Sequence, residues 1–147
     1  MDARAILDKL VSFKTVSNVS NLDLIDWVED YLKGHGVIAT RVYNEEGNKA
    51  SLYANVGPDV AGGVVLSGHT DVVPVEGQAW DTDPFEVTLK GDKYYGRGTC
   101  DMKGGLAASI IAAEAFIETH PNFAGAIEIS GTADEETGGY GGVAYLA

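Results

Sequence analysis

Three short polar segments of the chain each follow an apolar run, and this arrangement constrains the fold more than any other feature. They are SGHTDVVP at residues 67–74, GRGTCDMKG at residues 96–104 and TADEETG at residues 132–138. Short apolar runs bounded by turn residues are typical of strands. In α/β sheets, ligands bind beyond the carboxyl ends of the strands. The three segments are therefore expected to converge at one edge of a sheet.

The rest of the chain alternates between predicted helices and strands. Hydrophobic spacing and stop signals predict helices over residues 2–14, from Asn21 to Gly34 or Gly36, over residues 102–120, and from residue 143 onward. Strands are expected at residues 37–43, 50–56, 63–68 and 125–130, with a long loop at 70–84 and a hairpin of 85–90 with 93–95. Residues 63–68 favour a strand buried on both faces. The pattern predicts an α/β fold, a mixed sheet sandwiched by helices.

Composition excludes several classes of partner. The chain has 10 basic and 22 acidic residues, a formal net charge of −12. This balance argues against binding to nucleic acid and to anionic membrane surfaces. The single cysteine, Cys100, forms no internal disulfide and suggests a reducing compartment. Charges in the first nine residues and the lack of a run of ~18 apolar residues argue against a signal peptide and a membrane span, so we expect a cytoplasmic protein.

The first polar segment offers an imidazole and a carboxylate two residues apart. If the strand conformation continues, His69 and Asp71 point the same way. Imidazole and carboxylate groups are ligands for Zn²⁺ and similar divalent ions. Asp71 is either a ligand or the group that accepts the second ring N–H of a metal-bound histidine. The alternative is a histidine that is packed or hydrogen-bonded at a strand end.

The second segment superficially matches a dinucleotide-binding loop, but it has Asp101 where that fingerprint requires a third glycine. An aspartate there would repel a pyrophosphate, so we reject this interpretation. A carboxylate with two oxygens can instead bridge two cations. The alternative for Asp101 is an ordinary helix N-cap. We expect the neighbouring Cys100 to be buried, and we leave it out of the site.

The third segment places Asp134, Glu135 and Glu136 in a row after a predicted strand. Adjacent like charges are unfavourable unless a cation or solvent relieves them. One of a pair of carboxylates can bind a metal while the other acts as a general base. The alternative is a solvated acidic loop, against which stands the glycine-rich stretch at residues 138–142, where backbone can approach closely.

The three segments together resemble the M20 family of zinc aminoacylases and peptidases, and WDTDPF at residues 80–85 resembles the same family's loop. The resemblance covers essentially the whole chain, with four motifs in the family's order. It is strongest to the branch of acetylornithine deacetylases and succinyl-diaminopimelate desuccinylases. The sequence TCDMKG at residues 99–104 favours the deacetylase, an enzyme of arginine biosynthesis.

The resemblance implies a site with two zinc ions, in whose place Co or Mn is also expected to serve. His69 would bind one ion, with Asp71 behind it to orient the ring. Asp101 would bridge both ions and precede a cis peptide bond. Glu136 would bind the second ion, and Glu135 would be the general base.

The resemblance also implies that residues 1–147 are the N-terminal part of a zinc-peptidase-like catalytic domain. This piece would be incomplete, because the remainder of that domain, which carries two further ligands, and a dimerisation or lid domain would lie outside it. Residues 1–147 alone should bind metal weakly and be inactive. The full-length protein would be a homodimer that hydrolyses the amide of a small N-acyl amino acid. The alternatives are a desuccinylase, a dipeptidase or carboxypeptidase of the family, or a truncated non-catalytic module.

Overall fold

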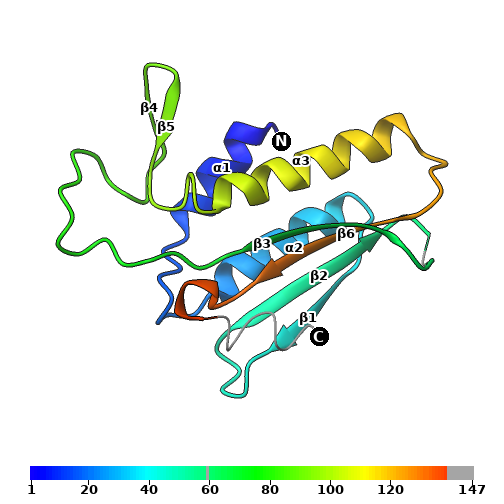
Figure 1. Ribbon diagram of the computed structural model, residues 1–147, viewed down its shortest axis with the longest axis horizontal. Coiled ribbons are helices and arrows are strands. Elements are labelled where there is room, and N and C mark those ends of the chain that lie inside the picture. Colours follow the sequence, from blue (N-terminus) through cyan, green and yellow to red (C-terminus); the bar gives the residue numbers. More distant parts are fainter. Residues whose placement is uncertain (59, 139–147) are drawn as a thin grey trace.

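The computed structural model describes residues 1–58 and 60–138, so the helix expected from residue 143 lies outside the described residues. Three helices pack with a four-stranded mixed sheet of order β1-β2-β6-β3 (Figure 1). The helices are α1 (Ala3–Ser12), α2 (Leu22–Gly34) and α3 (Lys103–Thr119). The sheet contains β1 (Ala39–Tyr43), β2 (Ala50–Val56), β3 (Gly63–His69) and β6 (Ala126–Thr132). This arrangement confirms the predicted α/β class.

The register of the sheet brings two of the polar segments together. β1 pairs with β2, and β2 with β6, in antiparallel fashion, whereas β3 pairs with β6 in parallel. His69, the last residue of β3, lies opposite Thr132, the last residue of β6. Because both strands end at the same edge, the segments that follow them leave the sheet side by side.

One core cluster joins the buried faces of all three helices to the sheet. α1 contributes Ile6 and Leu10, and the sheet contributes Leu52 and Ile129, all at most 2% exposed. Apolar side chains recur on α1 at helical spacing, which places them on the face that packs against α3. This packing holds the start of α3 against the edge of the sheet where the polar segments lie.

The second polar segment reaches that edge by another route. The strands before it, β4 (Thr88–Lys90) and β5 (Lys93–Tyr95), form the predicted hairpin, which is a separate two-stranded sheet (Figure 1). After the hairpin, the second polar segment leads the chain back into α3.

Among the described residues, none of the helices has the length and apolar character that a membrane span requires.

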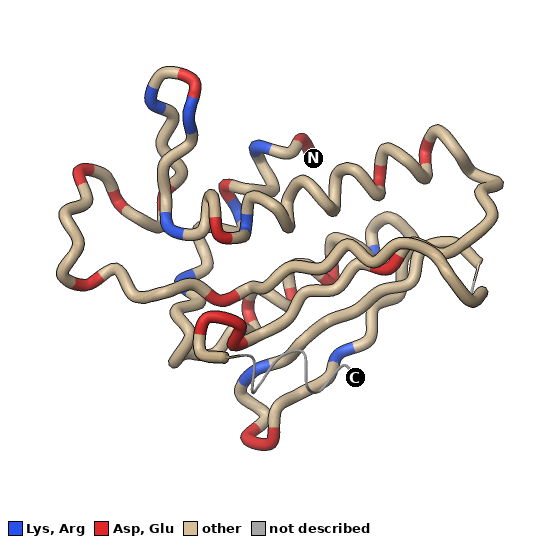
Figure 2. Tube along the Cα trace, in the orientation of Figure 1, with Lys and Arg blue, Asp and Glu red and all other residues tan. Residues whose placement is uncertain are grey.

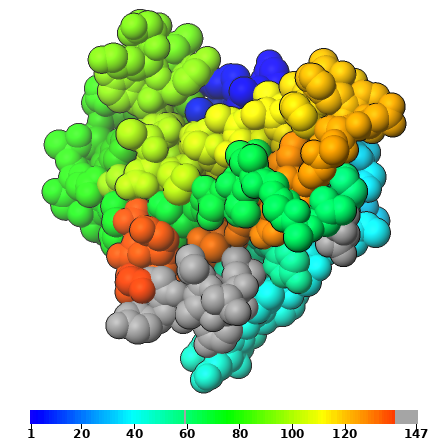
Figure 3. Space-filling model, turned by 45° about the vertical axis from the view of Figure 1, so that its right-hand side comes forward, coloured from blue at the N-terminus to red at the C-terminus, as the bar shows by residue number. Residues whose placement is uncertain are grey.

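The prediction that residues 63–68 are buried on both faces is wrong. Val64 and Val65 are each 59% exposed, and the first half of β3 lies at the surface (Figure 3). The reason is the strand order, since β3 is an edge strand with only β6 as a neighbour among residues 1–58 and 60–138. An apolar run shows that a strand can be buried, but not which elements cover it.

Two adjacent glycines in the first turn of α3 allow a matched test of how closely this helix packs against the segment before it. A Cβ added at Gly104 would lie 2.1 Å from the backbone oxygen of Thr99, whereas one at Gly105 would meet only the flexible end of Met102 at 3.3 Å. We predict that Gly104→Ala lowers the free energy of unfolding by about 1–3 kcal/mol through overpacking. Gly105→Ala should be neutral or stabilising by up to about 1 kcal/mol, because alanine favours helix. Urea unfolding measures both, and equal effects would contradict the observed contact.

Candidate metal centre

His69 is buried at the end of β3, and its two ring nitrogens face different partners. Its Nδ1 lies 3.0 Å from the backbone oxygen of Asp71 and 3.4 Å from Asp71 Oδ1. A neutral ring that donates its Nδ1–H to these oxygens leaves the Nε2 lone pair free to bind a metal. The His69 side chain is only 4% exposed, so its ring is held in place by its surroundings.

Asp101 approaches Nε2 of His69 from the segment before α3. Its Oδ1 lies 3.1 Å from that nitrogen, and its side chain is 76% exposed. The N-cap position of α3 is occupied by Met102, so the N-cap alternative for Asp101 does not match the structure. The peptide bond between Asp101 and Met102 is cis, as the family resemblance implied.

The third segment forms a short 3₁₀ turn, η1 (Glu135–Thr137), directly after β6. Glu135 Oε2 lies 3.7 Å from Nε2 of His69. One ligand atom from each of His69, Asp101 and Glu136 can be chosen so that all three lie within 4.8 Å of one another. One imidazole nitrogen and two carboxylates at this spacing are a donor set that fits Zn²⁺ or a similar divalent ion.

The carboxylate of Asp71 connects the ends of the two parallel strands. Asp71 Oδ1 accepts a hydrogen bond from the backbone N–H of Glu135 at 3.1 Å, and Oδ2 accepts one from that of Glu136 at 3.2 Å. Oδ2 also accepts a hydrogen bond from Ser17 Oγ at 2.8 Å. Because these donors and His69 already occupy both oxygens, Asp71 is placed to orient the site from behind.

The electrostatics of the site reflect a high density of acidic groups, which include the first two residues of η1 and the residue before it (Figure 2). The side-chain hydrogen bond with Asp71 raises the pKa of His69 to about 9, although burial opposes this shift. Burial alone would raise the pKa of Asp71, but the hydrogen bonds from His69, Ser17 and the turn outweigh it and lower that pKa. Burial, and then the charge of Asp101, raise the pKa of Glu136. A bound cation would relieve this repulsion between carboxylates.

Sequence reasoning missed two buried residues that support the site. Ser17 lies 54 residues from Asp71 in the chain and carries no local motif. Lys103 is fully buried, donates from Nζ to the backbone oxygen of Phe13 at 2.7 Å, and has its pKa lowered to about 7 by burial. The expectation that Cys100 is buried is wrong, because the segment before α3 turns its side chain outward and leaves it exposed.

Residues 65–147, more than half of the chain, match the profile of Peptidase family M20/M25/M40. The chain belongs to this family. Among its curated M20 relatives, a succinyl-diaminopimelate desuccinylase of Stenotrophomonas maltophilia (strain R551-3) is 46% identical over 85 residues, which are 57% of this chain and 23% of the relative. One of Legionella pneumophila (strain Paris) is 36% identical over 137 residues, 92% of this chain and 35% of the relative.

The fold of the M20 chain also matches solved structures. The crystal structure of human carnosine dipeptidase 1 superposes with a TM-score of 0.80 and 26% identity, covering 94% of this chain and 33% of that one. The chain thus spans about a quarter to a third of the length of these M20 relatives. The family resemblance and fold are confirmed, and both of the curated relatives carry the name of desuccinylase, not of deacetylase.

The contact between His69 and Asp71 predicts a measurable titration in the metal-free protein. We expect the imidazole of His69 to titrate near pH 9 rather than near its ordinary value of 6.5. Because the pKa is raised on folding, the stabilisation by the protonated ring is complete below pH 6.5 and is lost as the pH rises through about 9.

NMR of the chelator-treated protein measures this titration directly. Asp71→Asn should move the midpoint down, because it removes the negative charge that holds the proton. A wild-type midpoint at or below 6.5 would contradict the observed pairing.

Proposed function

We propose that residues 1–147 form the N-terminal part of the catalytic domain of a metal-dependent M20 hydrolase that cleaves the amide of an N-acyl amino acid. The observation that carries the proposal is the approach of ligand atoms from His69, Asp101 and Glu136 to within 4.8 Å of one another. The names of the curated relatives point to N-succinyl-diaminopimelate as the first substrate to test. The rest of the catalytic domain and a dimerisation domain belong to the full-length homodimer in this proposal.

The donor set supports two zinc ions, with Co or Mn as substitutes. His69 Nε2 and Asp101 would hold one ion, and Asp101 and Glu136 would hold the other. When bound, such ions supply Lewis acidity that favours deprotonation of water and stabilises negative charge on a carbonyl oxygen. Asp71 keeps the ring of His69 in the tautomer and orientation that expose Nε2.

Glu135 is the proposed general base. Its side chain is 56% exposed and its Oε2 lies 3.7 Å from His69 Nε2, so it borders the metal position without being enclosed in it. Its carboxylate would accept a proton from water as the water oxygen bonds to the acyl carbon. The same proton would then pass to the amide nitrogen as the C–N bond breaks, giving a carboxylic acid and a free amine.

Three ligands cannot complete the shells of two ions, because a catalytic zinc normally has three protein ligands and a water. Since the matched part of this chain covers only 23% and 35% of the two curated relatives, we assign the missing ligands to sequence beyond residue 147. On this proposal the isolated residues 1–147 bind zinc weakly and show negligible turnover. Tight stoichiometric zinc with turnover in the isolated chain would contradict it.

The substrate is tested by a comparison of acyl groups. The purified full-length protein should have its highest kcat/KM on N-succinyl-diaminopimelate, with N-acetylornithine and carnosine as competing substrates. A higher kcat/KM on N-acetylornithine would move the protein to the deacetylase, and one on carnosine would move it to the dipeptidases.

Substitution of Glu135 separates a base from a ligand. We predict that Glu135→Gln in the full-length protein lowers kcat by about 10²–10⁴-fold, the usual contribution of general acid–base catalysis, and retains bound zinc. Glu136→Gln, one residue away, should instead lose zinc together with activity. Metal analysis beside kinetics distinguishes the two, and equal zinc loss in both variants would refute the role of Glu135.

A further inference from the structure

We infer that Lys49 is a positioning residue of this site. Through an ion pair with Asp134, Lys49 holds the turn that bears Glu135 and Glu136 against the metal position. This inference rests on the proposed function for its catalytic consequence. The contact itself is a property of the fold that can be tested without a substrate.

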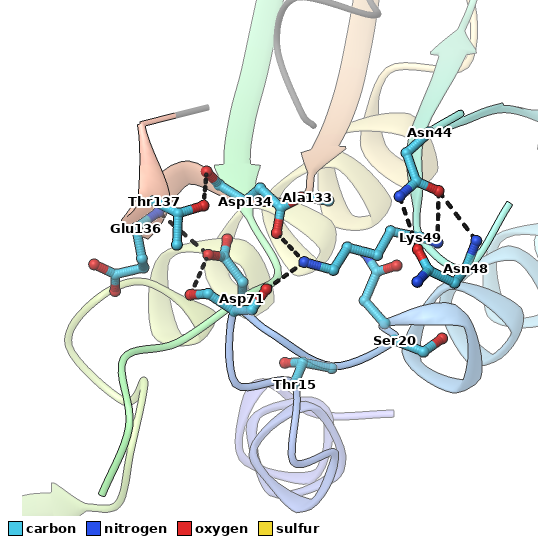
Figure 4. A network of polar contacts seen from close by, with 12 residues as sticks. Thr15, Ser20, Asn44, Asn48, Lys49, Asp71, Ala133, Asp134, Glu136 and Thr137 are labelled. Carbon is cyan, nitrogen blue, oxygen red and sulfur yellow. Dashed lines mark hydrogen bonds and ion pairs between the residues drawn. The ribbon is translucent and has the colours of Figure 1, made fainter. Parts of the chain in front are cut away.

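Lys49 Nζ contacts Asp134 Oδ1 (Figure 4). It also donates a hydrogen bond to the backbone oxygen of Ser17. The side chains of Lys49 and Asp134 are only 12% and 13% exposed. A largely buried pair is screened far less by water and salt than a surface pair. Removal of one partner would therefore leave the other charge poorly solvated.

These contacts close a ring around the acidic turn. Ser17 bonds Lys49 through its backbone oxygen and Asp71 through its hydroxyl. Asp71 in turn accepts hydrogen bonds from the backbone N–H groups of Glu135 and Glu136. Asp134, which precedes these two residues, returns the ring to Lys49 (Figure 4). The turn is thus held from both sides, by Asp71 at its N–H groups and by Lys49 at Asp134, the residue before it.

Lys49 is itself held in place. The side-chain oxygen of Asn44 accepts hydrogen bonds from the backbone N–H groups of Asn48 and Lys49, at 3.1 and 3.0 Å. The next residue, Ala50, is fixed by both the amide nitrogen and the amide oxygen of Asn21, at 2.8 and 3.0 Å. A cation on so constrained a backbone can fix the position of its partner rather than follow it.

The pair also determines which carboxylates remain for the metal. Asp134 has φ 57°, a left-handed conformation that is uncommon for a residue with a side chain, and its carboxylate is directed to Lys49. The following two carboxylates are left to border His69 and Asp101. Because substitutions of Lys49 and Asp134 leave every residue of the hydrophobic core cluster unchanged, they should shift the turn without unfolding the domain.

The test uses the full-length enzyme with Lys49→Met, Asp134→Asn and both changes together. Lys49→Met should lower kcat by about 10–100-fold through misplacement of Glu135, with KM changed by less than about twofold. The double variant should be no worse than the more impaired single variant, because the two residues act as one unit. Lys49→Arg, which keeps the charge and the donors, should recover most of the kcat.

The control is Lys90→Met, the same chemical change in a lysine that pairs with Asp81 outside the site. It should leave kcat unchanged. Hydrogen exchange gives a second readout, because the amides of Glu135 and Glu136 are bonded to Asp71. These amides should exchange faster in Lys49→Met and in Asp134→Asn, but not in Lys90→Met.

Unchanged kcat in Lys49→Met, independent losses that multiply in the double variant, or faster exchange spread over the whole chain would each overturn the inference. If Lys49→Met fails to fold, Asp134→Asn carries the same test from the other partner. Exchange of the two amides needs no substrate. A wild-type enzyme inactive on all acyl amino acids would therefore refute the proposed function while exchange still decides the role of Lys49.

Discussion

The buried carboxylate of Asp71 is the interaction on which the arrangement of this site depends. It contacts the ring of His69 and accepts hydrogen bonds from Ser17 and from the two backbone N–H groups of the acidic turn. A buried charge is costly unless it is paired and hydrogen-bonded, and here both conditions hold. The same contacts that stabilise the charge bring the end of β3 and the turn after β6 to one point. The parallel register of these strands, with His69 opposite Thr132, makes this possible.

The acidic character of the chain has a local meaning at this point. Asp101 and Glu135 lie 3.1 and 3.7 Å from Nε2 of His69, and a carboxylate oxygen of Glu136 lies nearby. Burial raises the pKa of Glu136, and the charge of Asp101 raises it further. A divalent cation is the species that converts this repulsion into attraction. The pair between Lys49 and Asp134 removes one carboxylate from the competition, so the neighbouring two can serve as ligand and base. Electrostatics and backbone geometry thus favour the same division of roles.

The sequence predicted those parts of the structure that follow from local pattern. Side chains two residues apart on a strand point the same way, which predicted that His69 and Asp71 lie on one side. Two apolar strands that end at one edge predicted the approach of Glu135 and Glu136 to these residues. The family resemblance implied the cis peptide bond after Asp101, which the structure contains, and the role that we propose for Asp101. Ser17 and Lys49 escaped prediction because their contacts span 54 and 85 residues and leave no periodic trace. β3 was misassigned as buried because apolar residues do not reveal which strand lies at an edge.

We propose that His69, Asp101 and Glu136 together bind divalent metal ions. The most direct test is an anomalous difference map at the zinc edge, from crystals of the full-length protein grown with zinc. We expect a peak about 2.0–2.2 Å from Nε2 of His69 and from a carboxylate oxygen of Asp101, and a second peak at the same distance from Glu136. Ordered zinc bound elsewhere, with these three side chains free of it, would contradict the assignment of these residues as ligands.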